Sequence, residues 1–458
     1  MRRLLIGTVT AAAVLLAGCS SHSDTAPDTE ASGSPAAGAS AKASSDFGTL
    51  KNVCGPGTAK SSGVQGVTGS SIRVGVLTDL GFTKNSEFPD AAEVFTSWCN
   101  AAGGIDGRKL VPVTRDTGLM QVREQVLAAC KADFALVGGG AALDGLGVAD
   151  RLKCLLPDFP AQSTQAVGSD LQVLATGAGV GYFPYAGYYR WLLKDKYPGS
   201  AGKVGIIAGD SPVSKTFAAQ YTEGVAGLGG KVTYNDLYPA AGVADWTPYA
   251  QKIKSKGVKG LTFLGDFASL AKLEQALTAI GYAPDWIDAN SNAYGPAFPQ
   301  LAGTALATQH NYAELSATAP LESAAANPAT QQVIDLFKKY APGKQVTFPV
   351  LRAFSAWLLF ATSARDCATL TRTCVYQNAL KQTAWTGGGL QAPADLSRND
   401  VPPKCYSIVE TTAKGWRPAD FGPDTGAYRC DAPAYKYKGD YGKPATLASV
   451  GKSLSDLR

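Results

Sequence analysis

Short apolar runs alternate along the chain with longer segments in which apolar residues recur at helical spacing. The run 72–77 predicts a strand, and the segment 91–102 carries Val94, Phe95 and Trp98 on one helical face. The same spacing continues with strand 109–114, helix 121–130, strand 134–137 and helix 142–152. Strand–helix repeats of this length predict βαβ units, and therefore a parallel sheet.

The alternation restarts near residue 182 and continues through the rest of the chain. The predicted elements are helix 182–196, strand 203–208, helix 215–228, strand 231–237, helix 248–256, strand 260–264, helix 268–280, strand 286–287, helices 331–340 and 350–365, and strand 406–409. Because a single domain rarely holds so many units, we expect two α/β lobes.

The first residues have the features of a secretory signal. Arg2 and Arg3 precede an apolar run, 4–17, that is too short to span a bilayer. The run ends in Leu-Ala-Gly-Cys at 16–19, which resembles the lipobox of bacterial lipoproteins. The resemblance implies that residues 1–18 are a signal peptide and that acylated Cys19 anchors the protein at the extracytoplasmic face of the cell membrane. The alternative is an ordinary signal peptide that contains a Cys.

The residues after Cys19 predict a flexible spacer. From 20 to about 45 the chain consists largely of Ser, Ala, Gly, Thr, Asp and Pro, which cannot bury a core. We assign 19–69 to the acylated Cys and a tether, which lets the globular body stand off the membrane.

The composition fits a globular body and excludes some functions. The 458 residues are 45% hydrophobic and 17% charged, and the net charge is +5 without a Lys/Arg cluster. A mild, dispersed charge argues against nucleic-acid binding. The apolar run 351–361 has Arg352 and Arg365 beside it and predicts a buried helix rather than a membrane span.

Eight cysteines besides Cys19 predict disulfides, because their number is even and the chain is exported. No C-x-x-C pair occurs, and His310 is the only His in the body, so tight Cys/His pairs for a metal are missing. Spacing does not determine the connectivity. Proximity favours Cys367–Cys374 and Cys405–Cys430, which leaves Cys130–Cys154 and Cys54–Cys99 as hypotheses.

Motifs for catalysis and cofactor binding are missing from the sequence. There is no G-x-S-x-G and no phosphate-binding Gly-Lys-Ser/Thr loop. The run 138–140 is Gly-Gly-Gly after a strand, but the third glycine of a dinucleotide fingerprint would fall at Leu143. We expect no enzyme activity, no cofactor and no metal.

The loops after the predicted strands offer a binding site instead, because ligands of open α/β sheets lie beyond the carboxyl ends of strands. These loops are 78–87, 138–145, 159–163, 210–215, 265–268 and 290–294. They combine Ser and backbone N–H groups, which hold anions, with aromatic residues that can surround an apolar group. The alternative is that they are ordinary turns and helix caps.

The segment 100–110, N-A-A-G-G-I-D-G-R-K-L, resembles the N-A-A-G-G-I-N-G-R-K-I stretch of substrate-binding lipoproteins of ABC transporters. These are periplasmic-binding-protein-like proteins of type I, the branched-chain amino acid class. The resemblance includes strand 72–77, the segment 204–210 and the succession of elements to about 410. It implies a small-molecule ligand, a membrane permease as partner, and a monomer.

The resemblance also implies the fold, which is two Rossmann-like lobes, each a parallel sheet flanked by helices, joined by a three-strand hinge. In that arrangement the first lobe is 70–176 plus 306–383, and the second lobe is 177–305 plus 384–430. The residues 431–458 form a C-terminal tail. Ligand binds in the cleft between the lobes, and the lobes close on it.

We expect the ligand-binding residues in the loops that line this cleft. They are Gly139, Gly140, Ala141, Ala161, Gln162, Ser163, Tyr182, Ser211, Asp266, Phe267, Asn290 and Tyr294. Ala141 stands where the family often has Ser, and Asn290 stands where branched-chain binders carry an acid, for which Asp266 is a candidate substitute. The ligand class therefore stays open among amino acids, amides and related small organic solutes.

Three functions are compatible with these features. The first is a solute-binding lipoprotein that delivers its ligand to an ABC importer. The second is a membrane-anchored sensor of the same fold, and the third is an extracytoplasmic enzyme, which would depend on His310.

Overall fold

The computed structural model describes residues 44–58, 63–239 and 242–457. The predicted signal peptide and Cys19 lie outside them. The residues Ala43–Arg458 form one compact unit, which contains two sheets with their covering helices. None of the helices in the described ranges is long and apolar enough to cross a membrane.

The first lobe is built on a four-stranded sheet in the order β2-β1-β3-β4, in which all neighbours are parallel. Its strands are β1 (Ser71–Thr78), β2 (Lys109–Asp116), β3 (Ala135–Val137) and β4 (Asp158–Phe159). The helices between them are α1 (Leu80–Thr83), α2 (Glu87–Ala101), α3 (Val122–Ala132) and α4 (Val148–Lys153). The parallel βαβ order confirms the prediction for this half of the chain.

The second lobe is built on a seven-stranded sheet in the order β11-β10-β9-β8-β7-β5-β6. Its strands are β5 (Val204–Gly209), β6 (Val232–Tyr238), β7 (Gly260–Leu264), β8 (Trp286–Asp288), β9 (Asn311–Glu314), β10 (Ile408–Thr412) and β11 (Gly415–Pro418). Its helices are α5 (Ala186–Arg190), which continues as the π-helical η2 (Trp191–Lys196), α6 (Pro212–Gly227), α7 (Thr247–Ser255), α8 (Phe267–Ala279) and α9 (Ala297–Ala302). The last two strands are antiparallel to their neighbours, so this sheet is mixed and not entirely parallel as predicted.

Short 3₁₀ turns complete the connections of both lobes. They are η1 (Asp144–Gly147), η3 (Pro198–Ser200), η4 (Ser291–Ala293), η5 (Gly303–Ala307), η6 (Leu321–Ala326), η7 (Gly387–Gly389), η8 (Ala448–Val450) and η9 (Leu454–Asp456). Of these, η1 and η4 directly follow the loops after β3 and β8, where ligand contacts were predicted.

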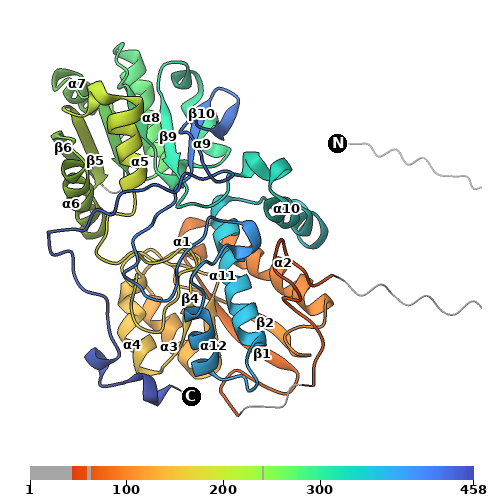
Figure 1. The fold of residues 1–458 in the computed structure, drawn as a ribbon. Coiled ribbons are helices and arrows are strands. Elements are labelled where there is room, and N and C mark those ends of the chain that lie inside the picture. The colour runs from red at the N-terminus through yellow and green to blue at the C-terminus, as the bar shows by residue number, and fades with distance from the viewer. Residues whose placement is uncertain (1–43, 59–62, 240–241, 458) are drawn as a thin grey trace, which may run out of the picture. The chain divides into compact units, whose positions relative to one another are not determined.

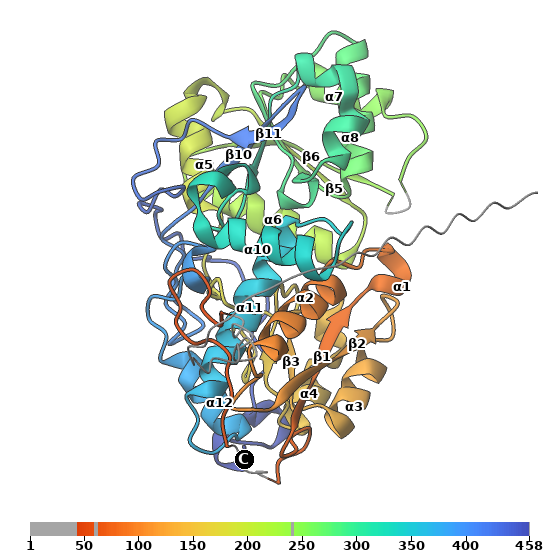
Figure 2. The same cartoon turned by 90° about the vertical axis from the view of Figure 1, so that its right-hand side faces the viewer.

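Helix α11 (Phe348–Arg365) forms the centre of the first lobe's core, and 14 of its 18 residues are buried. It packs against α2, β3, β4 and α12 (Arg372–Leu380) (Figure 1). The Trp357 ring stacks on Phe95 at 5.4 Å between centroids, and Phe360 meets Phe159 edge-to-face at 5.6 Å. Helix α10 (Pro328–Tyr340) covers α2 on the side that faces the second lobe (Figure 2).

The chain passes between the lobes in three segments that hydrogen-bond to one another. Ala319 donates its N–H to the Leu390 carbonyl, and Ala392 donates to the Ala317 carbonyl, each at 2.9 Å. The first segment joins them where the Gln391 side chain donates to the Ala175 carbonyl at 2.8 Å. These bonds form the predicted three-strand hinge.

The tether is shorter than predicted. Phe47 and Val53 are fully buried in the first lobe's core, although they fall within the predicted tether 19–69. Gly55 donates to the Gly104 carbonyl at 2.6 Å. The prediction is wrong over this part because residues 46–54 include large apolar side chains that the low-complexity stretch before them lacks.

Two predicted lobe boundaries also differ from the structure. Strand β9 pairs with β8 and so belongs to the second sheet, although 306–383 was assigned to the first lobe. Trp385, Leu390 and Leu396 lie in the core of the first lobe, although 384–430 was assigned to the second. The second difference arises because the chain from 385 to 396 still packs on the first lobe's core before it enters the second sheet at β10.

Four disulfides join the eight cysteines of the described residues. They are Cys54–Cys99, Cys130–Cys154, Cys367–Cys374 and Cys405–Cys430. All four hypothetical pairs are therefore confirmed, and three of them close loops within the first lobe.

The C-terminal segment crosses from the second lobe to the first (Figure 1). Near α6, the Glu223 carboxylate accepts hydrogen bonds from the N–H groups of Lys438 and Gly439 and from the Tyr441 hydroxyl. Further on, Leu447 and Leu457 pack beside α4 with Leu152 and Leu171. The predicted tail thus contacts both lobes.

A carboxyl group lies inside the second lobe, between α8 and β9. Glu274 is fully buried, and the Asn311 side chain donates to its Oε2 at 3.2 Å. Its other oxygen, Oε1, has no hydrogen-bond partner. Burial raises the pKa of Glu274 from 4.5 to about 8, so the folded protein binds this proton more tightly than the unfolded chain does.

Replacing Glu274 by Gln should therefore change how stability depends on pH. The amount that protonated Glu274 adds to the free energy of unfolding is fully present below about pH 4.5, and it is lost as the pH rises towards 8. We expect urea unfolding to show a smaller fall in the free energy of unfolding between pH 5 and pH 8 in Glu274→Gln than in the wild type. Glu124→Gln, an exposed change on α3, is the control. An unaltered slope in Glu274→Gln would contradict the assignment.

Candidate functional site

The loops after β3 and β4 lie against each other, as the sequence predicts. The Ala161 N–H donates to the Gly139 carbonyl at 2.8 Å, and the Gly140 backbone packs against Gln162. The loops form the wall of a small cavity at the carboxyl edge of the first sheet. Its lining residues are Leu77, Leu136, Gly139, Gly140, Ala141, Asp144, Asp158, Pro160 and Gln162. Four of the predicted residues thus line this cavity, and Ala161 and Ser163 lie directly beside Gln162 in the sequence.

Asp144 organises the loop after β4. Its carboxylate accepts hydrogen bonds from the Ser163 hydroxyl at 2.7 Å and from the N–H groups of Thr164, Gln165 and Ala166 at 2.7 to 3.0 Å. The donors that could hold an anionic ligand at this loop are therefore directed at a carboxylate of the protein itself. The role of Ser163 in binding a solute stays a prediction.

Three predicted residues lie after neighbouring strands of the second sheet. Ser211 follows β5 and caps α6 by accepting from the Ser214 N–H, while Asp266 follows β7 and caps α8 by accepting from the Ser269 N–H at 2.8 Å. Asn290 follows β8 and donates to the Phe263 carbonyl at 2.9 Å. Each side chain thus has a local structural partner, and Asp266 is exposed. Phe267 begins α8 and is half-buried.

The remaining two predicted residues contact other parts of the protein. Tyr182 pairs with Lys436 of the C-terminal segment, whose ammonium lies 6.0 Å from the centre of the tyrosine ring. Tyr294 is buried, its hydroxyl hydrogen-bonds Glu322, and it accepts from the Leu321 N–H at 2.8 Å. Tyr294 therefore fixes the loop after β8 to the start of η6, beside the junction of the lobes.

A buried polar group lies where the carboxyl ends of β8 and β9 approach the first turns of α11. In it, the Tyr189 hydroxyl donates to Asp288 at 2.6 Å and lies 2.6 Å from the Thr262 hydroxyl. Burial raises the pKa of Asp288 to about 6, although the bond from Tyr189 opposes the rise. Burial also raises the pKa of Tyr185 to about 12, and the negative charge of Glu314 adds to that rise.

The polar group continues to Arg352, which α11 contributes from the first lobe. The Arg352 guanidinium lies 5.4 Å from the centre of the Phe348 ring, and Nη2 donates to the Thr176 hydroxyl at 3.4 Å. Burial lowers the pKa of Arg352, and the charges of Tyr185 and of Glu314, at the end of β9, oppose that decrease. Groups from both lobes therefore meet at this position.

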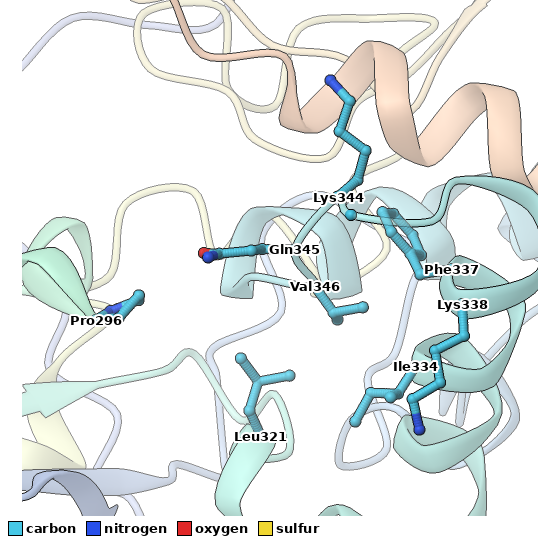
Figure 3. Close-up of a pocket in the computed structure, with 9 residues that line it drawn as sticks. Pro296, Leu321, Ile334, Phe337, Lys338, Lys344, Gln345 and Val346 are labelled. Carbon is cyan, nitrogen blue, oxygen red and sulfur yellow. The ribbon is translucent and has the colours of Figure 1, made fainter.

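A larger pocket of about 390 Å³ opens beside the junction, between the loop after η4, the start of η6, α10 and the loop that precedes α11 (Figure 3). Its lining residues are Pro296, Leu321, Ile334, Phe337, Lys338, Gly343, Lys344, Gln345 and Val346. The Lys344 ammonium forms an ion pair with the Asp90 carboxylate, with 3.2 Å between Nζ and Oδ1. The volume suits a small ligand, but none of the predicted site residues lines this pocket.

Asp288, Glu314 and Arg352, which belong to this buried polar group, are not among the residues predicted from the sequence. One signal was available: Arg352 is the only charge in the first four turns of a largely apolar helix. A charge in such a position must find a polar partner when the helix is buried. Glu314 gave no comparable signal because β9 was not predicted as a strand.

A family model described as "Periplasmic binding protein" matches residues 71–415. No curated protein matches the sequence. Solved structures with the same fold include a fatty acid ABC transporter substrate-binding protein from Thermomonospora curvata. It is 19% identical, with a TM-score of 0.63, and the match covers 84% of this chain and 97% of that chain.

Two further solved structures are similar over most of their length. The leucine-binding protein LivK from Thermotoga maritima is 15% identical, with a TM-score of 0.61 and coverage of 76% of this chain and 97% of that one. LivJ from Streptococcus pneumoniae, in complex with isoleucine, is 17% identical, with a TM-score of 0.58 and coverage of 75% and 96%. At these identities the likeness concerns the fold.

Replacing Asp144 by Ala should loosen the loop after β4. Three backbone N–H groups and the Ser163 hydroxyl lose their acceptor, which we expect to lower local stability by roughly 1–3 kcal/mol. Hydrogen exchange of the amides of 164–166 should become faster in Asp144→Ala and stay unchanged in Asp335→Ala, an exposed control on α10. Equal protection in the wild type and Asp144→Ala would show that the loop does not depend on this carboxylate.

Proposed function

This chain belongs to the periplasmic binding protein family, and on that basis we propose that it captures a small organic solute between its lobes and delivers it to an ABC importer. The observation that carries the proposal is the family match over 71–415, which includes the first sheet, the second sheet up to β10 and the crossovers between them. The solute class we propose is an amino acid, an amide or a related small molecule. We propose no catalytic step and no cofactor.

The geometry of the junction supports binding between the lobes. The loops after β3 and β4 lie at the carboxyl edge of the first sheet, and polar groups at the ends of β8 and β9 approach α11. A solute held by both lobes would favour the closed arrangement by its greater affinity for it. Named ligands of the structural neighbours, which are fatty acid, leucine and isoleucine, are all small molecules with a carboxyl group.

We also propose that the mature protein is a monomeric lipoprotein that begins at Cys19 and is held at the extracytoplasmic face of the membrane. The support is the motif at 16–19 after a short apolar run. An anchored binding protein remains near its permease, because the spacer limits the volume that the body can explore.

Solute binding should raise the thermal stability of the wild-type protein. We would test leucine, butyramide and octanoate by differential scanning calorimetry, since a ligand at 100 times its Kd adds about 2.7 kcal/mol to the free energy of unfolding. Small-angle scattering should show a smaller radius of gyration with the bound solute, because the lobes close. A solute that the protein converts into a product would contradict the proposal in favour of an enzyme.

Replacing Cys19 by Ser should release the protein from the membrane. Acyl chains on Cys19 supply the proposed anchor, and without them the described body offers no spanning helix. We expect the wild type in the detergent phase of a Triton X-114 separation and Cys19→Ser in the aqueous phase. Ser20→Ala leaves the acceptor cysteine intact and should behave as the wild type. If Cys19→Ser stayed in the detergent phase, another anchor would be required.

A further inference from the structure

Three lysines at the amino ends of strands in the second sheet are brought side by side by the fold. Lys203, Lys231 and Lys259 directly precede β5, β6 and β7, which are neighbours in the order β6-β5-β7. The Lys259 N–H donates to the Lys203 carbonyl at 2.8 Å, and the Val204 N–H donates to the Lys231 carbonyl at 3.0 Å. The three residues are therefore adjacent at the spacing of hydrogen-bonded strands, although they lie far apart in the sequence.

Four more lysines lie at the ends of the helical segments beside these strands, namely Lys194 and Lys196 of η2 and Lys254 and Lys256 of α7. A Cβ atom added to Gly257, at the end of α7, would lie 3.4 Å from the Nζ of Lys203. One added to Gly229, just before Lys231, would lie 3.8 Å from the Cε of Lys194. The seven residues therefore form one continuous region, which we call the lysine surface.

The lysine surface lies at the end of the second lobe that is opposite the junction. Strands β5, β6 and β7 are parallel, so their amino ends share one edge of the sheet and the loops with Ser211 and Asp266 share the other. Figures 1 and 2 both show α7 at the end of the molecule that is far from the first lobe. A partner bound to the lysine surface would therefore leave the loops at the carboxyl edge uncovered.

The charges of the lysine surface are not compensated by the protein. All seven side chains are exposed, and none forms an ion pair with another described residue. Asp195, between two of the lysines in the sequence, is bound to Arg429 at 3.0 Å, and Asp285, which precedes β8, is half-buried. The dipole of α7 favours cations at its end, but strands have no comparable dipole, and like charges on neighbouring strands repel each other. An anion against the three strand lysines would remove that repulsion.

The arrangement suits an extended array of phosphates better than a single small anion. None of the seven lysines lines either of the two cavities described above. Lysine ammonium groups are compact, hydrated point charges without the planar geometry that fixes one anion in a bidentate contact. A membrane that contains anionic phospholipids presents many phosphates in one plane and attracts each nearby lysine. The proposed anchor also keeps the body close to a membrane, because residues 19–43 can span at most about 80 Å.

We propose that the lysine surface binds the anionic phospholipid headgroups of the membrane to which the protein is anchored. Acyl chains and a cationic surface then act together, since each strengthens the membrane contact of the other. The contact orients the second lobe on the membrane and leaves the first lobe free to move relative to it. The inference uses the proposed anchor only for proximity and does not depend on the identity of the solute.

The test measures sedimentation of the chain with lipid vesicles. Residues 20–458 contain the whole compact unit but neither the signal peptide nor Cys19, so binding comes from the body alone. We expect the wild type to bind vesicles of equal parts phosphatidylglycerol and phosphatidylcholine, and not phosphatidylcholine alone. Binding should weaken as salt rises from about 50 to about 300 mM, because salt screens exposed charges. The triple variant Lys203→Gln, Lys231→Gln and Lys259→Gln should bind roughly 10- to 100-fold more weakly.

A matched control removes the same charge from the first lobe. The triple variant Lys109→Gln, Lys131→Gln and Lys153→Gln changes three exposed lysines, of which Lys109 likewise begins a strand, and should bind as the wild type does. Because all six side chains are exposed, both triple variants should keep the wild-type circular dichroism spectrum.

Equal vesicle affinity of the two triple variants would overturn the inference, as would no binding of the wild type or equal binding to neutral vesicles. Release by inorganic phosphate beyond that caused by sodium chloride of the same ionic strength would indicate a site for a single anion instead. Tighter binding to a DNA duplex than to anionic vesicles would overturn the choice of partner. None of these results bears on solute capture, which calorimetry tests separately.

A second measurement needs no variant. Sulfosuccinimidyl acetate acetylates exposed lysines, and mass spectrometry reports the rate at each one. With anionic vesicles present, Lys203, Lys231 and Lys259 should react more slowly, because the headgroups cover them, whereas Lys109 and Lys131 should keep their rates. Equal slowing of both sets, or no slowing of the first, would overturn the assignment of the contact to the lysine surface.

Discussion

The burial of α11 is the constraint on which the rest of the structure depends. This helix places Trp357 and Phe360 among the aromatic side chains of the first lobe's core, and every neighbouring element packs against it. Because most of its faces are covered, it can move only together with that lobe. Its first turn nevertheless reaches the second lobe, where Phe348 packs with Ala313 and Leu315, so a deeply buried helix of one lobe also contacts the other. A polar residue in the first turns of α11 is already held in a fixed position, so it loses little further conformational entropy when a solute binds.

Much of the fold could be predicted from the sequence because its long elements have regular apolar spacing. Helices α2, α6, α8 and α11 lie within a few residues of the predicted ranges. Strand β9 was missed because two of its four residues, Asn311 and Glu314, are polar although all four are buried. The pattern of hydrophobic and polar positions describes burial only where polar side chains stay at the surface, and β9 breaks that rule.

The candidate site was harder to predict than the fold. The sequence correctly brings the loops after β3 and β4 together, since parallel strands end at one edge of a sheet. It does not reveal that Asp144, which follows the loop after β3, accepts the hydrogen bonds that the loop after β4 could otherwise donate to a ligand. Nor does it show that Ser211 and Asp266 act as helix caps, because the same residue types serve as caps and as ligand contacts. Such distinctions depend on long-range contacts, which spacing along the chain does not encode.

The C-terminal segment has a consequence for how far the lobes can separate. Its backbone is bound to Glu223 on α6 through Gly439, and Ala445 accepts from the Asp170 N–H on the first lobe at 3.0 Å. Only five residues lie between these attachments, and an extended chain of that length reaches about 20 Å. As long as both attachments hold, the length of this segment sets the largest possible distance between its two attachment sites. It therefore restricts the opening of the lobes independently of the three crossovers.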